Sequence, residues 1–255
     1  MTVEYGARGL IGVLTPQANT TVEPEMAIRC PPGVATLAAR LCSAKRGMND
    51  RLLDYFEALP AMLAEFANAP IAACGFACTG AAYLAGAARE EAAVAELSAR
   101  AGWPLVTATG AIADALSAIG ARRIALLSPY DAGLEAEAAS YWQARGCEVA
   151  ATHSVFRHSE AFHPIYSLPS DATRTGIGLL SGAAAEAIVV LGTGLPSLAP
   201  IAAMPRAGGK RVLSSTFCLA WRLLVLAGAW PGGAAGLDAF LDDPGWRARL
   251  AAARG

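Results

Sequence analysis

The chain has 255 residues, of which 55% are hydrophobic and 16% charged, and its formal net charge is −1. This composition excludes a disordered or coiled-coil chain, and the near-neutral charge provides no basic surface for nucleic acid or anionic lipid. We therefore expect a compact fold of one or two closely packed domains whose partners are small molecules, with no nucleic acid and no membrane among them.

Short apolar segments of strand length recur along the chain, each followed by a small or polar residue and then by a helical pattern. The predicted strands are GLIGVLTP (9–16), PIAACGFACTG (70–80), WPLVTATG (103–110), RRIALLSPY (122–130), EAIVVLGTG (186–194) and KRVLSST (210–216). Helix-forming composition marks the segments 51–66, 87–101, 131–145 and 217–227. The alternation predicts an α/β fold in which helices cover both faces of parallel strands.

The ends of the predicted strands repeat along the chain. Pro16 and Pro129 are separated by almost the same number of residues as Cys78 and Gly192. The simplest interpretation is two comparable α/β halves, 1–115 and 116–225, followed by a C-terminal segment, 226–255, that packs back on the fold; the pattern also allows chain exchange between the halves. Because ligands bind beyond the carboxyl ends of parallel strands, we expect both sets of strand ends to face one cleft.

The setting of Cys78 distinguishes it from the other five cysteines. Scattered cysteines predict reduced thiols, and no second Cys or His pair has the spacing of a zinc site. Cys78 lies between a predicted strand and a predicted helix N-terminus, where the helix dipole can stabilise a thiolate. It is a candidate nucleophile or acid, and the alternative is an ordinary buried thiol. Cys74, within the strand, is expected to pack in the core.

Other polar residues also follow predicted strands. Asn19 and Thr21 precede a predicted helix, where capping is the commoner role. Tyr130 offers a hydroxyl to a carboxylate or an enolate, or else packs at a rim. The segment GTG (192–194) offers backbone N–H groups to an anion but lacks the Lys-Ser/Thr ending of a nucleotide loop. Adenylate cofactors are therefore not supported.

Three histidines, His153, His158 and His163, lie five residues apart in HSVFRHSEAFHPIY. This spacing fits neither one helical face nor a standard metal motif, so we predict a loop whose histidines lie at the surface or behind the residues of a site. Aromatic residues of the same region either line a pocket or pack in the core: Phe156, Phe162 and Tyr166.

The N-terminal sequence lacks the features of a secretory signal. It carries Glu4, and its apolar run is broken by Pro16. We therefore expect a cytoplasmic protein.

Five motifs in order resemble those of the aspartate/glutamate racemase superfamily, and most closely its maleate cis-trans isomerases and arylmalonate decarboxylases. They are GVLTPQANTTVEPE, FACTGAAYLAG, LLSPY, LGTGLPSLAPI and VLSSTFCLAW. The resemblance covers about residues 8–225. It implies two pseudo-symmetric parallel-sheet halves, a cofactor-free active site in the cleft between them and a small dicarboxylate substrate, and it allows a homo-oligomer.

The resemblance also implies a role for the thiol. Cys78 matches the first-half cysteine of the family, whereas the second-half cysteine falls at Gly192. Arylmalonate decarboxylase also has one thiol, but its cysteine resembles the second-half one. The present arrangement therefore looks like its mirror image.

Further site residues follow from the same motifs. Asn19 matches the carboxylate-holding asparagine of the isomerases, and Tyr130 matches a carboxylate-binding tyrosine. The second-half asparagine of the isomerases has no match in FRHSEAFHPIY, which weighs against maleate as the substrate. The implied oxyanion nest consists of Thr79 and the amides of Gly80, Thr193 and Gly194.

The absent second thiol guides the prediction of function. A two-base racemase needs a group on each face of its substrate, so Gly192 argues against racemisation. Decarboxylation needs one proton donor, because loss of carbon dioxide leaves an enediolate that neutral Cys78 protonates. We predict a cofactor-independent decarboxylase of a substituted malonate or similar small dicarboxylate. The alternatives are a maleate-type isomerase with Cys78 as nucleophile, a β-elimination enzyme, and a non-catalytic carboxylate-binding protein.

Overall fold

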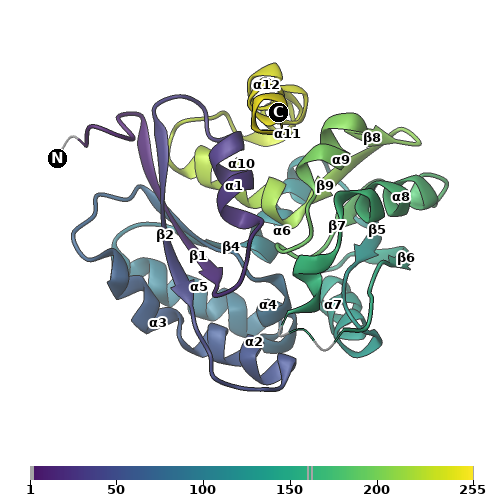
Figure 1. The fold of residues 1–255 in the computed structure, drawn as a ribbon, viewed down its shortest axis with the longest axis horizontal. Coiled ribbons are helices and arrows are strands. Elements are labelled where there is room, and N and C mark those ends of the chain that lie inside the picture. The colour runs from purple at the N-terminus through teal and green to yellow at the C-terminus, as the bar shows by residue number, and fades with distance from the viewer. Residues whose placement is uncertain (1–2, 160, 162, 255) are drawn as a thin grey trace.

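The computed structural model describes residues 3–159, 161 and 163–254 and contains two mainly parallel sheets that lie side by side (Figure 1). The first sheet has the order β2-β1-β3-β4, with β1 Gly9–Pro16, β2 Val34–Leu41, β3 Ala73–Phe76 and β4 Leu105–Thr107. The second has the order β6-β5-β7-β9-β8, with β5 Arg123–Ser128, β6 Glu148–Ser154, β7 Ala187–Val190, β8 Arg206–Ala207 and β9 Lys210–Ser214. Only the short pairing of β8 with β9 is antiparallel among the described strand pairs.

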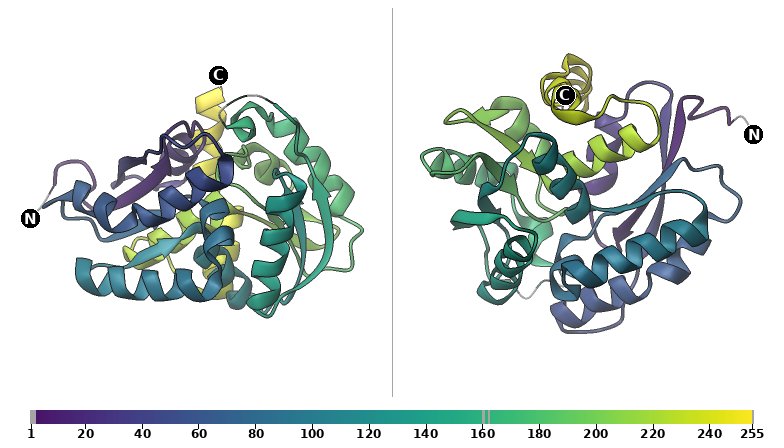
Figure 2. Two further views of the ribbon diagram at one scale, coloured as in Figure 1. Left: turned by 90° about the horizontal axis from the view of Figure 1, so that it is seen from below. Right: turned by 180° about the vertical axis from the view of Figure 1, so that it is seen from behind.

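Helices connect and cover the strands of both sheets (Figure 2). Those that follow the first-sheet strands are α1 Val22–Arg29, α2 Met48–Glu57, α3 Leu59–Met62, the 3-10 helix η1 Leu63–Phe66, α4 Thr79–Ala85, α5 Ala87–Ala101 and α6 Ala108–Ala118. Those of the second half and the C-terminus are α7 Ala132–Ala144, the 3-10 helix η2 Pro164–Ser167, α8 Ser170–Leu180, α9 Leu198–Ala203, α10 Ser215–Leu226, α11 Gly233–Asp242 and α12 Pro244–Arg254. None of the helices in the described ranges is both long and apolar enough to cross a membrane.

All six predicted strands are present: β1 has the predicted bounds, and the other five are shorter than the sequence indicated. The predicted helix over 87–101 is confirmed as α5, whereas the segment 51–66 is divided among α2, α3 and η1. Three further strands lie outside the predicted segments: β2, β6 and the two-residue β8. The predicted histidine loop is wrong at its first residue, because His153 belongs to β6.

Helix α10 packs across the boundary between the two sheets. It follows β9 of the second sheet, yet it lies against α6 and against β3 and β4 of the first sheet. A Cβ at Gly75 in β3 would approach the side chain of Leu223 to 2.7 Å. The absence of a side chain at this position lets α10 lie directly on the strand that leads to Cys78.

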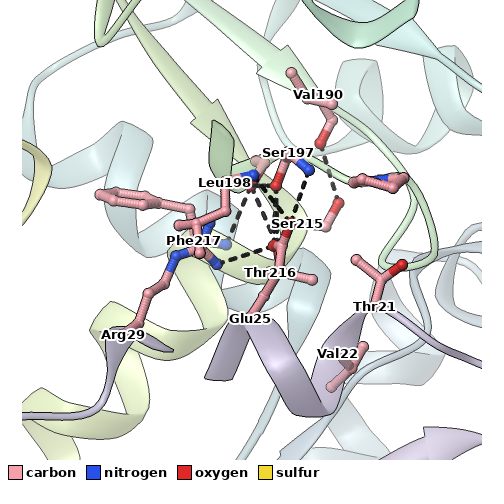
Figure 3. A network of polar contacts seen from close by, with 12 residues as sticks. Thr21, Val22, Glu25, Arg29, Val190, Ser197, Leu198, Ser215, Thr216 and Phe217 are labelled. Carbon is pink, nitrogen blue, oxygen red and sulfur yellow. Dashed lines mark hydrogen bonds and ion pairs between the residues drawn. The ribbon is translucent and has the colours of Figure 1, made fainter. Parts of the chain in front are cut away.

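A buried polar network joins α1 to the second half (Figure 3). The Glu25 carboxylate accepts hydrogen bonds from the backbone N–H groups of Ser197 and Leu198, at 2.8 and 2.9 Å. The hydroxyl groups of Ser197 and Thr216 also donate to it. The guanidinium of Arg29 lies 3.4 Å from the same carboxylate. Because Glu25 and Arg29 are almost completely buried, this network fixes the loop before α9 against α1 in a water-poor region.

Candidate active site

A small cavity lies at the carboxyl ends of the strands, where the two halves meet. Its volume is about 60 Å³, enough for several water molecules or a small ligand. Its walls include Pro16 at the end of β1, Cys78 after β3, Tyr130 after β5 and Gly192 after β7. Parallel strands from both sheets therefore bring their ends to one cavity, which is where an open α/β sheet binds ligands.

Cys78 occupies the N-cap position of α4 in an extended backbone conformation. Its side chain lines the cavity but the residue is only 4% exposed, and the backbone N–H of Ala81 donates to its sulfur. Burial raises the pKa of this thiol to about 12, and the hydrogen bond from Ala81 only partly offsets that effect. The expected stabilisation of a thiolate by the helix is therefore outweighed, and the thiol is protonated at neutral pH.

Thr79 and Tyr130 bring two hydroxyl groups together beside the thiol. Their oxygens lie 2.7 Å apart, so one hydroxyl donates to the other and one proton remains available to a ligand. Burial raises the pKa of Tyr130 well above its usual value, and the hydrogen bond with Thr79 offsets this only in part. The Tyr130 hydroxyl is consequently a neutral donor over the whole physiological pH range.

Gly192 lies where the motifs align the second thiol of the family, and a side chain there would require its neighbours to shift. Its φ of +81° is in the left-handed region that favours glycine. A Cβ at this position would come within 2.7 Å of both Ile165 Cδ1 and Pro129 Cγ. A Cβ at Gly194 would likewise come within 2.4 Å of the Tyr166 ring. The part of the cavity wall around Gly192 and Gly194 is thus formed by backbone and mainly apolar side chains.

Asn19 lies behind the cavity wall and is not among the residues that line it. Its side-chain oxygen accepts from the N–H groups of Thr21 and Val22, at 2.8 and 3.0 Å, and so caps α1. Its amide nitrogen lies 3.4 Å from the hydroxyl of Thr193, which itself donates to the carbonyl of Ala77 at 2.7 Å. In this geometry Asn19 holds Thr193 against the strand end that carries the thiol.

The remaining predicted residues of the oxyanion nest lie on the cavity wall. Gly80, in the first turn of α4, lies against Leu52 and Leu134. Thr193 and Gly194 follow β7, and the carbonyl of Gly194 accepts a hydrogen bond from Thr21.

Sequence reasoning missed Tyr55 and misplaced His163, both of which line the cavity. The hydroxyl of Tyr55 lies 3.1 Å from His163 Nε2. Burial, with the charge of Arg51 as a second cause, lowers the pKa of His163 to about 4, so its ring is neutral at neutral pH. Tyr55 lies on the apolar face of α2 and carries the pattern of an ordinary core residue, which gave no signal for a site.

The other residues of the histidine segment separate in the structure. His158 is exposed. Phe156 and Tyr166 line the cavity, which is the first of the two alternatives predicted for them, a pocket lining or packing in the core. Phe162 is outside the described residues.

The cavity wall has no cationic side chain among its described residues, and its ionisable members include Asp131 and the neutral His163. Arg51 is buried nearby on α2 and donates to the carbonyl of Lys45 at 3.1 Å. Elsewhere, the described residues contain no group of three His, Cys, Asp or Glu side chains placed to hold a metal ion. An anionic ligand in this cavity would be held by hydroxyl and backbone N–H donors.

Solved structures with the same fold include enzymes of two activities. A Nocardia farcinica maleate cis-trans isomerase, a cysteine-to-serine mutant with a covalently bound succinylcysteine intermediate, has a TM-score of 0.77 at 21% identity, covering 90% of this chain and 98% of that chain. Arylmalonate decarboxylase has a TM-score of 0.72 at 21% identity, covering 91% of this chain and 99% of that chain.

A liganded arylmalonate decarboxylase with one glycine-to-cysteine and one cysteine-to-serine substitution has a TM-score of 0.77 at 20% identity, covering 92% of this chain and 99% of that chain. Among curated proteins, none matches this sequence.

Fold and site together define an α/β protein of the aspartate/glutamate racemase type, with two parallel sheets and one cavity at their strand ends. The sequence model for arylmalonate decarboxylase matches residues 11–237. The chain belongs to the arylmalonate decarboxylase family, and it is an enzyme of the lyase or isomerase kind. This membership sets aside the alternative of a non-catalytic binding protein.

Proposed function

We propose that the protein is a cofactor-independent decarboxylase of an α-substituted malonate, with Cys78 as the proton donor. The observation that carries this proposal is the asymmetry of the cavity. A thiol lines one side, whereas Ile165 and Pro129 fill the space that a side chain at Gly192 would occupy. A reaction that requires one proton on one face suits this arrangement better than a two-base reaction.

Substrate binding would use the donors at the strand ends. One carboxylate accepts from the Thr79–Tyr130 pair and from the backbone N–H groups of the segment 192–194. The α-substituent lies against the apolar part of the wall, which includes Met48, Leu52 and Leu134. Such a cavity favours a malonate that carries an apolar or aromatic group.

The reaction then proceeds without any other reagent. The bond between the α-carbon and one carboxyl group breaks, carbon dioxide leaves, and the electron pair forms an enediolate with the remaining carboxylate. The neutral hydroxyl groups of Thr79 and Tyr130 stabilise its negative charge. The S–H proton of Cys78 moves to the α-carbon from the thiol side, which fixes the handedness of the product.

Maleate isomerisation is the competing function. It would require the thiolate of Cys78 to add to a carbon–carbon double bond. The buried thiol, with its pKa raised to about 12, supports an acid more strongly than a nucleophile. The cavity also lacks a cationic lining side chain, among its described residues, that could hold a second carboxylate tightly.

Proton NMR in deuterated buffer tests the two functions in one tube. The purified protein receives maleate together with an aryl-methylmalonate, and we expect loss of the malonate and one deuterium at the α-carbon of a single-handed monoacid. Cys78→Ala should lower this rate by at least about 10²-fold, whereas Cys74→Ala, a core thiol four residues earlier, should retain it. Fumarate without monoacid would overturn the proposal in favour of isomerisation.

Product handedness gives a second test. Because Cys78 lies on the first-half side, we expect the hand opposite to that produced by decarboxylases with the second-half cysteine. The same hand, determined by chiral chromatography, would contradict the assignment of Cys78 as proton donor.

A further inference from the structure

Each decarboxylation consumes one proton, and Cys78 can supply only one before it must be protonated again. A malonate dianion plus one proton gives a monoacid anion plus carbon dioxide, so each turnover converts the Cys78 thiol into a thiolate. Cys78 is only 4% exposed, and its surroundings disfavour the charged form. The sulfur must therefore regain a proton inside the cavity before the next turnover. This inference rests on the proposed function.

A hydrogen-bonded pair from opposite halves lines the same cavity. Tyr55 comes from α2 and His163 directly precedes η2, and the Tyr55 hydroxyl lies 3.1 Å from His163 Nε2. Tyr55 is completely buried, whereas His163 retains 8% exposure. The pair thus runs from the interior toward the less buried histidine.

The surroundings of the pair suit proton transfer. Tyr55 and Cys78 line the same cavity. Burial, followed by the charge of the neighbouring Cys78, raises the pKa of Tyr55 to about 12, so its hydroxyl carries a proton at neutral pH. The rings of His163 and Tyr166 pack with their centroids 5.2 Å apart, and this contact holds the imidazole in place. A neutral imidazole can accept a proton at one nitrogen while it donates from the other.

We propose that Tyr55 and His163 form a relay that returns a proton from solvent to the Cys78 thiolate after each turnover. The Tyr55 hydroxyl proton moves to the sulfur, and the proton on His163 Nε2 moves to the Tyr55 oxygen. His163 Nδ1 takes one proton from water, so the sum of these steps is the transfer of one solvent proton to sulfur. Exchange with water then restores the first tautomer of the ring.

Three other hydroxyl groups at the cavity, those of Thr79, Tyr130 and Thr193, have different partners. Tyr130 bonds to Thr79, and Thr193 donates to the carbonyl of Ala77. The Thr79–Tyr130 pair is therefore suited to substrate binding, and Thr193 is suited to holding the strand ends together. The alternative to a relay is direct entry of water to Cys78 when the product leaves.

Rapid-quench kinetics with phenylmalonate separates the relay from this alternative. The first turnover uses the proton that Cys78 already carries, so Tyr55→Phe and His163→Gln should form one product per active site at the wild-type rate. Later turnovers should then be slower by roughly tenfold or more, because reprotonation has lost its path. Imidazole added to His163→Ala should restore the later turnovers without altering the first.

Matched variants and the possible outcomes make the test decisive. His158→Gln removes an exposed histidine of the same segment and should behave as wild type. Unchanged later turnovers in both relay variants would overturn the relay in favour of direct water entry, and an equally slowed first turnover would assign the pair to substrate positioning instead. A wild-type enzyme that forms no product from phenylmalonate or its α-methyl derivative would overturn the proposed function, and with it the relay.

Discussion

The side-chain oxygens of Thr79 and Tyr130 lie 2.7 Å apart, although one residue begins α4 of the first half and the other follows β5 of the second. This hydrogen bond closes the cavity across the boundary between the halves and places both hydroxyl groups beside Cys78. A developing negative charge at this position meets neutral hydroxyl donors. Such donors are most effective when they are fixed before the reaction begins.

Tyr130→Phe should therefore impair the reaction more than the fold. We expect a decrease in kcat of about 10²–10³-fold, the usual effect of removing one donor from an oxyanion site. Thr79→Val should have a similar effect, and the double variant should lose less than the product of the two because the residues act as a pair. Steady-state kinetics on phenylmalonate and a urea unfolding curve provide the measurements; a large loss of stability with unchanged kcat would contradict this role.

A side chain at Gly192 should be tolerated poorly. Gly192→Cys places a Cβ at a φ of +81° and within 2.7 Å of Ile165 and Pro129, so we expect a loss of about 1–3 kcal/mol in the free energy of unfolding. The single variant should not racemise an arylpropionate. Gly192→Cys combined with Ile165→Ala removes one of the two collisions and should recover part of the stability.

Deuterium exchange at the α-carbon of each arylpropionate enantiomer shows whether a second proton-transferring face has been created. We expect exchange of both enantiomers only in the double variant. Efficient racemisation by the single variant would mean that Ile165 and Pro129 move aside without cost.

Alkylation of Cys78 should show the behaviour of a thiol with a raised pKa. Burial keeps Cys78 protonated up to a pKa of about 12, whereas an unperturbed cysteine titrates near 8.5. Labelling by iodoacetamide should consequently keep rising with pH through about pH 10 without a plateau, provided that the protein remains folded. Peptide mass spectrometry measures each site, with exposed Cys42 as the internal reference for reagent access. A plateau near pH 7 would instead identify a thiolate nucleophile and favour isomerisation.

Glu25→Ala should destabilise the protein strongly. Arg29 is almost fully buried beside Glu25, so the variant leaves a guanidinium without its carboxylate and frees the N–H groups of Ser197 and Leu198. We expect a loss of about 3–5 kcal/mol in the free energy of unfolding. Combining Glu25→Ala with Arg29→Met removes the unpaired charge and should recover part of that loss. Urea titration distinguishes these outcomes, and equal stabilities for the single and double variants would show that the charge is relieved in another way.

Two edge strands show where prediction of the fold from the sequence stopped. β2 and β6 lie at the ends of their sheets, and several of their residues are exposed or only partly buried. Such strands lack the continuous apolar run that identified the central strands β3, β5 and β7. Their absence from the prediction did not affect the site, because the cavity is formed at the ends of central strands.

The sequence by itself determined the central strands, the recurrence of strand ends in two halves and the unusual setting of Cys78, since each depends on local patterns of apolar, small and polar residues. Only the tertiary structure decided that the thiol is buried and protonated, that Ile165 and Pro129 occupy the space beside Gly192, and that Tyr55 meets His163. Burial and contacts of this kind arise between residues far apart in the chain. They depend on how closely the two halves pack, which no local pattern specifies.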